Sequence, residues 1–140
     1  VESKKGLTLD SKIVRNRMVN DHLANALKSK PSPIYSQKFA SRITTGNTTD
    51  DMAKIAQVDW IIEVVVERLD IKKLVFEQIE KYRKPGTLIT SNTSGIPIHF
   101  MSEGRSEDFQ QHFCGTHFFN PARYLKLFEI NKKKPRIHKL

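Results

Sequence analysis

The chain has 140 residues, of which 38% are apolar and 28% charged. This balance suits one compact domain with a modest core and excludes disorder throughout. The longest strongly apolar run, residues 60–66, is far too short to span a bilayer, and the sequence opens with no charged-then-apolar leader. The single cysteine, Cys114, cannot form an internal disulfide, which fits a cytoplasmic or organelle-matrix protein that is not secreted.

The net charge of +9 comes partly from the C-terminal segment; without its five basic residues the rest of the chain carries +4. Segment 131–140 contains no acidic residue and five basic ones, Lys132, Lys133, Lys134, Arg136 and Lys139. Such a run can bind nucleic acid or an anionic membrane, but a short charged end is more often simply solvated. We therefore predict a folded domain over residues 1–130 and a flexible basic tail over 131–140.

The first third of the chain is predicted to be mostly helical. Apolar residues recur at helical spacing over 10–28, which predicts a helix. The short β-branched segment 42–45, followed by a Gly-Asn pair, is typical of a strand and turn. A second helix is predicted over 48–56, capped by Thr48 or Thr49.

Residues 60–66 form the clearest predicted strand. They are nearly all apolar rather than alternating, which indicates burial on both faces, as in a parallel sheet. A helix over 71–83, closed by a Pro-Gly pair, and a strand at 87–90 complete a right-handed βαβ unit. A short helix at 98–102 and strands at 116–119 and 126–130 should follow. The predicted fold class is therefore α/β, with a mostly parallel sheet flanked by helices.

Ligands of open parallel sheets bind beyond the carboxyl ends of the strands. This rule selects residues 67–72 after the first strand, residues 91–95 after the second, and His117 with Asn120-Pro121 near the end of a third. We expect these segments to gather on one edge of the sheet. No G-x-G-x-x-G or Walker pattern can be drawn through the six glycines, so the sequence contains no recognisable pyrophosphate loop.

Three sequence motifs coincide with these segments. They are DWIIEVVVE at 59–67 followed by Lys72, PGT at 85–87 with SNTS at 91–94, and GTHFFNP at 115–121 followed by KLFE at 126–129. In this order and spacing they resemble the NAD-binding domain of 3-hydroxyacyl-CoA dehydrogenases, strongly over residues 40–130. The resemblance implies a truncated Rossmann-like domain whose cofactor is NAD.

The resemblance also implies roles for individual residues. His117 matches the family's catalytic base, which takes the proton of the substrate's 3-hydroxyl, and Glu129 matches the carboxylate that orients the imidazole. Ser94 and Asn120 match polar residues that lie beside both the substrate and the nicotinamide. The other cofactor-binding positions matched are Val65, Val66, Glu67 and Lys72.

Each of these residues also has an ordinary structural explanation. His117 could be a packed histidine, Ser94 a helix cap, and Lys72 part of a solvated helix face. Glu129 outside the motif would be a surface carboxylate. Glu63 lies within the apolar strand and needs a partner if it is buried, but no chemistry is assigned to it.

The expected function is NAD-dependent oxidation of (S)-3-hydroxyacyl-CoA to 3-oxoacyl-CoA in fatty-acid β-oxidation. The sequence lacks the Gly-rich turn that opens the family's domain and the helical domain that follows it. We therefore expect this chain alone to be weak or inactive and to need the remainder of a parent dehydrogenase, with a homo-oligomer left open.

Two alternatives remain at this point. The chain could be a non-catalytic interaction domain derived from the same fold. It could also be a basic nucleic-acid-binding module that uses its tail, although no recognised binding motif or aromatic platform accompanies the charges. No membrane partner is expected. No metal site is expected either, because no histidine and cysteine spacing matches a zinc set.

Overall fold

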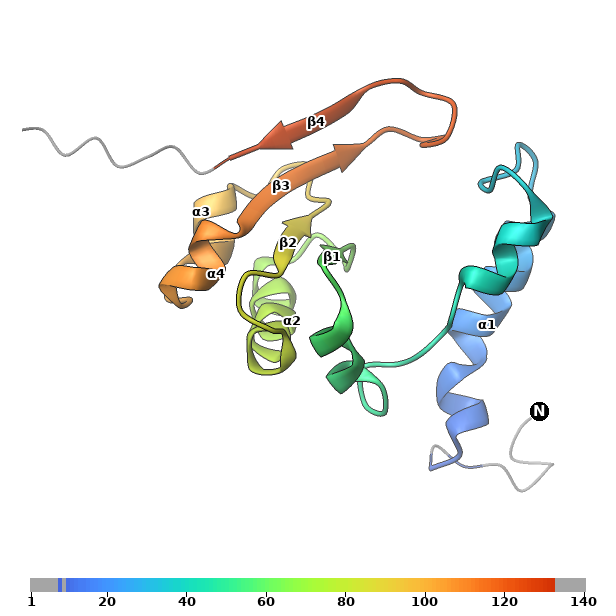
Figure 1. Ribbon diagram of the computed structural model, residues 1–140, viewed down its shortest axis with the longest axis horizontal. Helices are drawn as coiled ribbons and strands as arrows, with labels where there is room; N and C mark the ends of the chain where they lie inside the picture. Colours follow the sequence, from blue (N-terminus) through green and yellow to red (C-terminus); the bar gives the residue numbers. More distant parts are fainter. Residues whose placement is uncertain (1–7, 9, 133–140) are drawn as a thin grey trace, which may run out of the picture. The chain divides into compact units, whose positions relative to one another are not determined.

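The computed structural model describes residue 8 and residues 10–132 (Figure 1). The chain divides into two compact units. The first comprises Val1–Met52 and Asn120–Lys126, and the second comprises Ala53–Phe119 and Leu127–Leu140. Among the described residues, no helix combines the length and apolar character that crossing a membrane requires.

The second unit is built on a four-stranded sheet in the order β1-β2-β3-β4 (Figure 1). Strands β1 (Trp60–Glu63), β2 (Leu88–Ser91) and β3 (Phe113–Phe118) are parallel. Strand β4 (Phe128–Asn131) runs antiparallel to β3. The predicted α/β fold with a mostly parallel sheet is confirmed.

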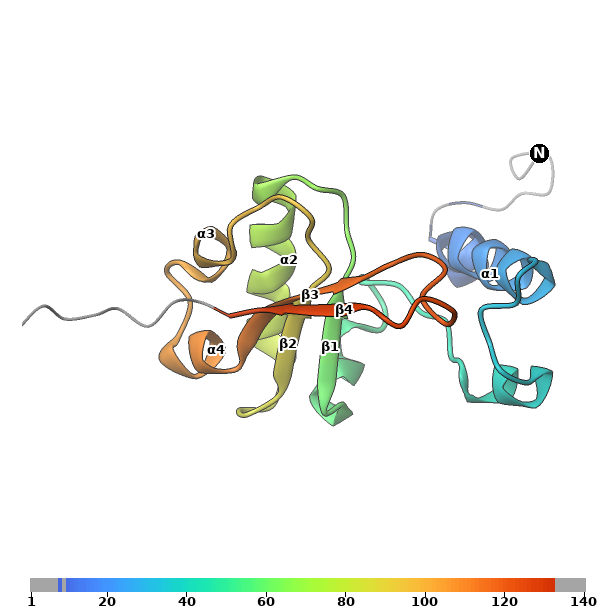
Figure 2. The same cartoon turned by 90° about the horizontal axis from the view of Figure 1, so that it is seen from above.

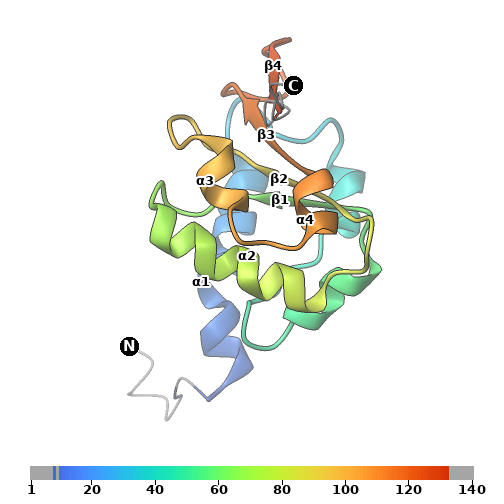
Figure 3. The same ribbon diagram turned by 90° about the vertical axis from the view of Figure 1, so that its left-hand side faces the viewer.

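Three helices cover one face of this sheet. They are α2 (Leu69–Tyr82), α3 (Ile98–Ser102) and α4 (Glu107–Gln111). Helix α2 connects β1 to β2 and runs alongside them (Figure 2). From the side, α2, α3 and α4 all lie in front of β1 and β2 (Figure 3). The sheet is therefore flanked by helices on this face.

The core of this unit lies between the three helices and the sheet. The ring of Phe76 on α2 stands edge-on to Phe109 of α4, with centroids 5.7 Å apart, and to Phe113 of β3, at 5.1 Å. The register pairs Phe113 with Ile89 of β2, which is fully buried on the same face. Apolar burial of this kind supplies the main driving force for packing α2 on the sheet.

The strand predicted over 60–66 is shorter than expected, and only one of its faces is buried. It ends at Glu63, while Trp60 and Ile62 are 43% and 41% exposed. The reason is that α2, α3 and α4 all pack on the opposite face of the sheet. On the outer face, Trp60 Nε1 donates to Thr90 Oγ1 at 3.1 Å.

The predicted Pro-Gly turn after α2 is confirmed. Gly86 has φ 79°, a conformation that favours glycine, and follows a proline, as in a type II turn. Its amide donates to Asp108 Oδ1 at 3.2 Å, and Asp108 also pairs with Arg83 at 2.5 Å. The hydrogen bond from Arg83 is the main cause of a lowered pKa at Asp108. These contacts tie α4 to the carboxyl end of α2.

The first unit contains α1 (Lys12–Lys28) and the 3-10 helix η2 (Gln37–Arg42). The strand predicted over 42–45 is wrong, because this stretch bonds to α1 through side chains instead of pairing with another strand. Thr45 Oγ1 donates to Asn20 Oδ1 at 2.7 Å. In the turn that follows, Asn47 Nδ2 donates to Asn16 Oδ1 of α1 at 2.6 Å.

The helix predicted over 48–56 appears as a shorter 3-10 helix, η3 (Met52–Gln57). The residues before it form a turn that is bonded to the side chain of Asn47. Its Oδ1 accepts from the amides of Thr49, at 3.0 Å, and Asp50, at 2.8 Å. An asparagine side chain that bonds its own following backbone is a common turn device, and it explains why the helix starts late.

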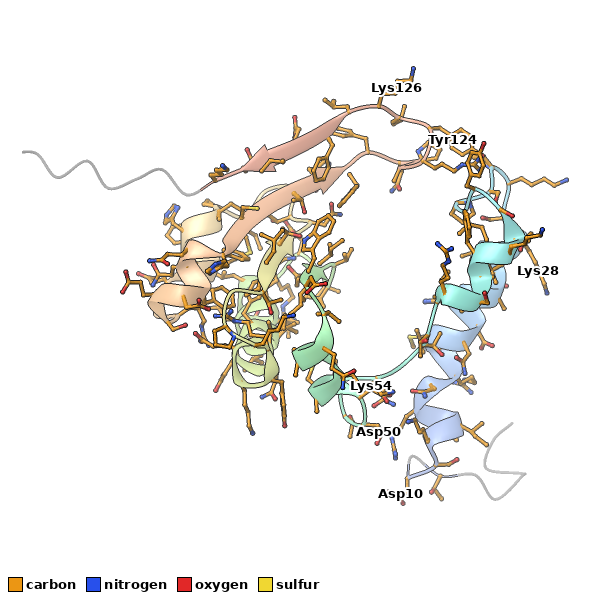
Figure 4. The ribbon with its side chains drawn as sticks, viewed as in Figure 1. Asp10, Lys28, Asp50, Lys54, Tyr124 and Lys126 are labelled. Carbon is orange, nitrogen blue, oxygen red and sulfur yellow. The ribbon has the colours of Figure 1, made fainter. Side chains whose placement is uncertain are left out.

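Two sets of polar contacts hold the first unit together at opposite ends of α1. Arg15 pairs with Asp50 at 2.8 Å near the start of the helix. Near its end, Arg123 donates to Ser32 O at 3.2 Å and stacks over the ring of Tyr124. In Figure 4, Asp50 lies near Asp10 at one end of α1 and Tyr124 lies near Lys28 at the other.

The predicted tail begins inside the sheet, since Asn131 is the last residue of β4. Residues 133–140 lie outside the described part of the chain. The division into a domain over 1–130 and a tail over 131–140 therefore stays a prediction.

Replacing Phe76 by alanine should destabilise the protein by about 3–5 kcal/mol, because the side chain is fully buried between two aromatic rings. Urea unfolding followed by circular dichroism measures the change. Leu74→Ala on the same helix is the control; Leu74 is 60% exposed, and a loss of about 0.5 kcal/mol or less is expected. Equal losses in the two variants would contradict the assignment of this core.

Candidate active site

The carboxyl ends of β1, β2 and β3 meet at one edge of the sheet. The register aligns Glu63 with Ser91, and Ser91 with Gly115. Neighbours aligned in this way point to the same face, and so does His117, two residues further along β3. This is the face on which the helices pack, so polar side chains meet there beside the core.

Glu63 is the most enclosed charged group at this edge, with a side chain that is 0% exposed. Its carboxylate accepts from Lys72 Nζ at 2.9 and 3.0 Å, from Ser91 Oγ at 2.5 Å, and from the Val65 amide at 2.5 Å. The partner that a buried Glu63 requires is therefore Lys72, with two further donors completing its hydrogen bonding.

Lys72 lies in the first turn of α2, and its side chain is 1% exposed. Its Nζ also lies 3.3 Å from Glu67 Oε2, so the ammonium is held between two carboxylates. The structure thus places Lys72 inside an ion-pair cluster rather than on a solvated helix face. Its predicted role toward the cofactor stays a prediction.

Glu67 connects this cluster to the loop after β2. Its Oε1 accepts from Thr93 Oγ1 at 2.5 Å, from the Gly95 amide at 3.0 Å, and from the Ser94 amide at 3.1 Å. Partial burial raises the pKa of Glu67, but these hydrogen bonds and the one from Lys72 outweigh it and lower the pKa to about 2. Glu67 is therefore a carboxylate at any physiological pH.

His117 lies beside the same loop. The half-buried ring places Nδ1 3.4 Å from Thr93 O and packs edge-on against Phe119 at 4.7 Å. Glu129 is its direct partner across the antiparallel β3–β4 pair. Residues opposed in this way have Cβ atoms about 4.5–5.5 Å apart, so the exposed Glu129 side chain leaves the sheet beside His117 and on the same face.

The other predicted site residues differ in how they are placed. Val65 and Val66 follow β1 and are 37% and 62% exposed, so they offer apolar surface at the edge. The exposed Ser94 is held there through its amide. Asn120 is exposed and belongs to the first compact unit. The predicted gathering at one edge therefore holds for Glu67, Lys72, Ser94 and His117.

Sequence reasoning assigned no individual role to three members of the cluster, Glu63, Ser91 and Thr93, although it selected segment 91–95 as a whole. A signal for Glu63 did exist, because it is the one carboxylate inside an otherwise apolar strand. Its partner Lys72 is nine residues away, and only the strand-to-helix turn brings the two together. For Ser91 and Thr93 the signal was only their place in segment 91–95, after the end of a predicted strand.

Because the contacts of Glu67 lower its pKa, they make the free energy of unfolding depend on pH. A carboxyl whose pKa falls from 4.5 to about 2 on folding stabilises the folded state above pH 4.5. This contribution to stability is lost as the pH falls from 4.5 to about 2. Glu67→Gln should therefore lose less stability than the parent protein between pH 4.5 and 2, and chemical unfolding at a series of pH values measures this. Identical pH dependence in the two proteins is the contrary result.

Comparison with known proteins agrees with the motifs. The family model described as 3-hydroxyacyl-CoA dehydrogenase, NAD binding domain, matches residues 8–136. A probable 3-hydroxyacyl-CoA dehydrogenase from Bacillus subtilis is 56% identical over 129 residues, which cover 92% of this chain and 16% of that protein. One from Deinococcus radiodurans is 43% identical over 136 residues, which cover 95% of this chain and 39% of that protein.

The structural comparison supports the same grouping. The crystal structure of (S)-3-hydroxybutyryl-CoA dehydrogenase from Ralstonia eutropha matches with a TM-score of 0.60 and 26% identity, over 88% of this chain and 42% of that one. The chain thus spans only a minor part, 16% and 39%, of the two curated relatives. Since the family model and both relatives match nearly the whole chain, it belongs to the NAD-binding-domain family of 3-hydroxyacyl-CoA dehydrogenases.

Proposed function

We propose that the protein containing this chain oxidises (S)-3-hydroxyacyl-CoA to 3-oxoacyl-CoA with NAD, as a step of fatty-acid β-oxidation. The observation that carries the proposal is the placement of His117. This imidazole lies opposite a carboxylate, at the ligand-binding edge of a parallel sheet. The family of the chain supplies the reaction class and the cofactor.

His117 acts as the base in this proposal. With a proton on Nδ1, the ring donates toward Thr93 O and leaves the lone pair of Nε2 for the substrate. Nε2 accepts the proton of the 3-hydroxyl as a hydride leaves C3, the carbon that bears this hydroxyl. The substrate loses a proton from its hydroxyl oxygen and a hydride from C3, which converts the alcohol to a ketone.

Glu129 supports the charge that appears on His117 during the reaction. The imidazole becomes a cation when it takes the hydroxyl proton. A carboxylate on the facing strand stabilises that cation through its negative charge, which is the electrostatic part of what the acid of a hydrolase triad does. Glu129 is exposed, so it carries its negative charge without the cost of burial.

The residues at this edge fit the reactive end of NAD. The chemistry that bound NAD would supply is acceptance of the hydride from the substrate's C3. Val65 and Val66 offer apolar surface for its rings, and Glu67 and Ser94 lie close by as polar groups. For Lys72 and Asn120 we keep the cofactor contacts that the family resemblance implies. No glycine-rich pyrophosphate turn occurs in the sequence, so we assign only the nicotinamide side of the cofactor to this chain.

The whole protein must supply the rest of the site. We propose that the remainder of the dehydrogenase binds the pyrophosphate and the CoA portion of the substrate, and that this chain alone is weakly active or inactive. We also propose a cytoplasmic or organelle-matrix location, which the single free cysteine supports. A homo-oligomer is compatible with this arrangement.

His117→Gln in the whole protein should lower kcat by ~10²–10⁴-fold, because the base is lost. NADH formation from (S)-3-hydroxybutyryl-CoA, followed by absorbance, measures the change. Glu129→Gln should cause a smaller loss, because the imidazole remains. His99→Gln, at an exposed position on α3, is the matched control and should keep normal activity. Full activity in His117→Gln would rule out the proposed mechanism.

A further inference from the structure

We infer that Glu63 and Lys72 form a buried positioning pair, which fixes the loop of residues 92–95 through Glu67. This loop carries Ser94 and the carbonyl that faces His117. The consequence for catalysis rests on the proposed function. The effect on the loop does not, because it follows from the contacts alone.

The pair connects three segments of the chain. Glu63 ends β1, Lys72 lies in the first turn of α2, and Glu67 lies in the turn between them. Lys72 Nζ contacts both carboxylates, at 2.9 Å from Glu63 Oε1 and 3.3 Å from Glu67 Oε2. The position of Glu67 is therefore set by an ammonium that the sheet itself holds in place.

Glu67 passes this constraint to the second loop. One of its oxygens receives Thr93 Oγ1 and the amides of Ser94 and Gly95. Thr93 Oγ1 also accepts from the Ile96 amide at 3.1 Å, and Thr93 O faces the imidazole of His117 at 3.4 Å. Thr93 thus joins the ion-pair cluster of Glu63, Lys72 and Glu67 to the proposed base, His117.

Stability alone does not account for this arrangement. Replacing a buried ion pair by apolar side chains of similar size is often neutral or stabilising, because burying two charges costs desolvation energy. An apolar pair has no oxygen atoms to accept these hydrogen bonds. It could not hold β1, α2 and the turn between them in one arrangement as the carboxylates do. With only 1% of its side chain exposed, Lys72 influences the loop through its contacts with Glu63 and Glu67. Glu63 and Lys72 are therefore positioning residues, not catalytic ones.

The test is the double variant Glu63→Gln/Lys72→Met in the whole protein. Removing both charges avoids leaving one of them buried and unpaired, so the variant should keep most of its stability. We expect kcat to fall by ~10-fold or more with little change in KM, because the reacting groups are misplaced while substrate contacts remain. Faster hydrogen exchange at the Ser94 and Gly95 amides should accompany this fall.

The matched control is Asp59→Asn/Lys84→Met. This pair has the same 2.9 Å spacing and joins the opposite ends of the same two elements, with Asp59 just before β1 and Lys84 just after α2, but it is exposed. It should change neither kcat nor the exchange of the two amides. Any loss shared by both double variants would reflect a general effect of removing a pair, and would overturn the inference.

Three further outcomes decide the question. Normal kcat and normal amide exchange in the Glu63/Lys72 variant would overturn the inference. If that variant does not fold, Glu67→Met gives the answer, since it removes the last link while leaving the buried pair intact; unchanged amide exchange there would also overturn it. If the parent protein shows no dehydrogenase activity, the proposed function fails, while amide exchange still decides whether the pair positions the loop.

Discussion

A carboxylate buried at the end of a strand places strict demands on its surroundings, and Glu63 is such a group. Its side chain is 0% exposed, so each of its oxygens needs a donor from the protein. Those donors come from the start of α2 and the end of β2, through Lys72 and Ser91. The connection from β1 to β2 therefore cannot shift along the sheet without breaking this cluster. The Glu63–Lys72 contact therefore fixes where β1 ends and its loop begins at this edge of the sheet.

Helix α2 is anchored at both ends by charge and along its middle by apolar packing. Lys72 fixes its first turn, and Arg83, the residue after its last, pairs with Asp108 of α4. Between them, Phe76 and Ile79 are buried against the sheet. Apolar packing tolerates small sliding movements, whereas ion pairs with several hydrogen bonds are directional. The combination explains how a short sheet covered on one face can still hold its loops in fixed positions.

Much of this arrangement could be predicted from local pattern, and the failures have physical causes. The Pro-Gly turn and the strand–helix–strand order follow from backbone preferences that neighbouring residues determine. Segment 42–45 looked like a strand because its residues are β-branched, but a strand also needs a partner, and Thr45 bonds to α1 instead. Residues 60–66 looked buried on both faces because apolar content does not show which face the helices cover. The Glu63–Lys72 contact depends on how a strand end and a helix start meet in space, which no periodicity encodes.

The two halves of the candidate site are held by different physical means. Ser94 and the loop around it depend on the carboxylate of Glu67, and hence on charge. Glu129 depends on the backbone ladder between β3 and β4, aided by the contact of the Phe118 and Phe128 rings at 4.6 Å. Every residue of β4 is exposed, so core packing contributes little to its position. A change that neutralises the ion-pair cluster should therefore release the loop and leave the His117–Glu129 register unchanged. The position of His117 relative to Glu129 and the position of the Ser94 loop can therefore be changed independently at this edge of the sheet.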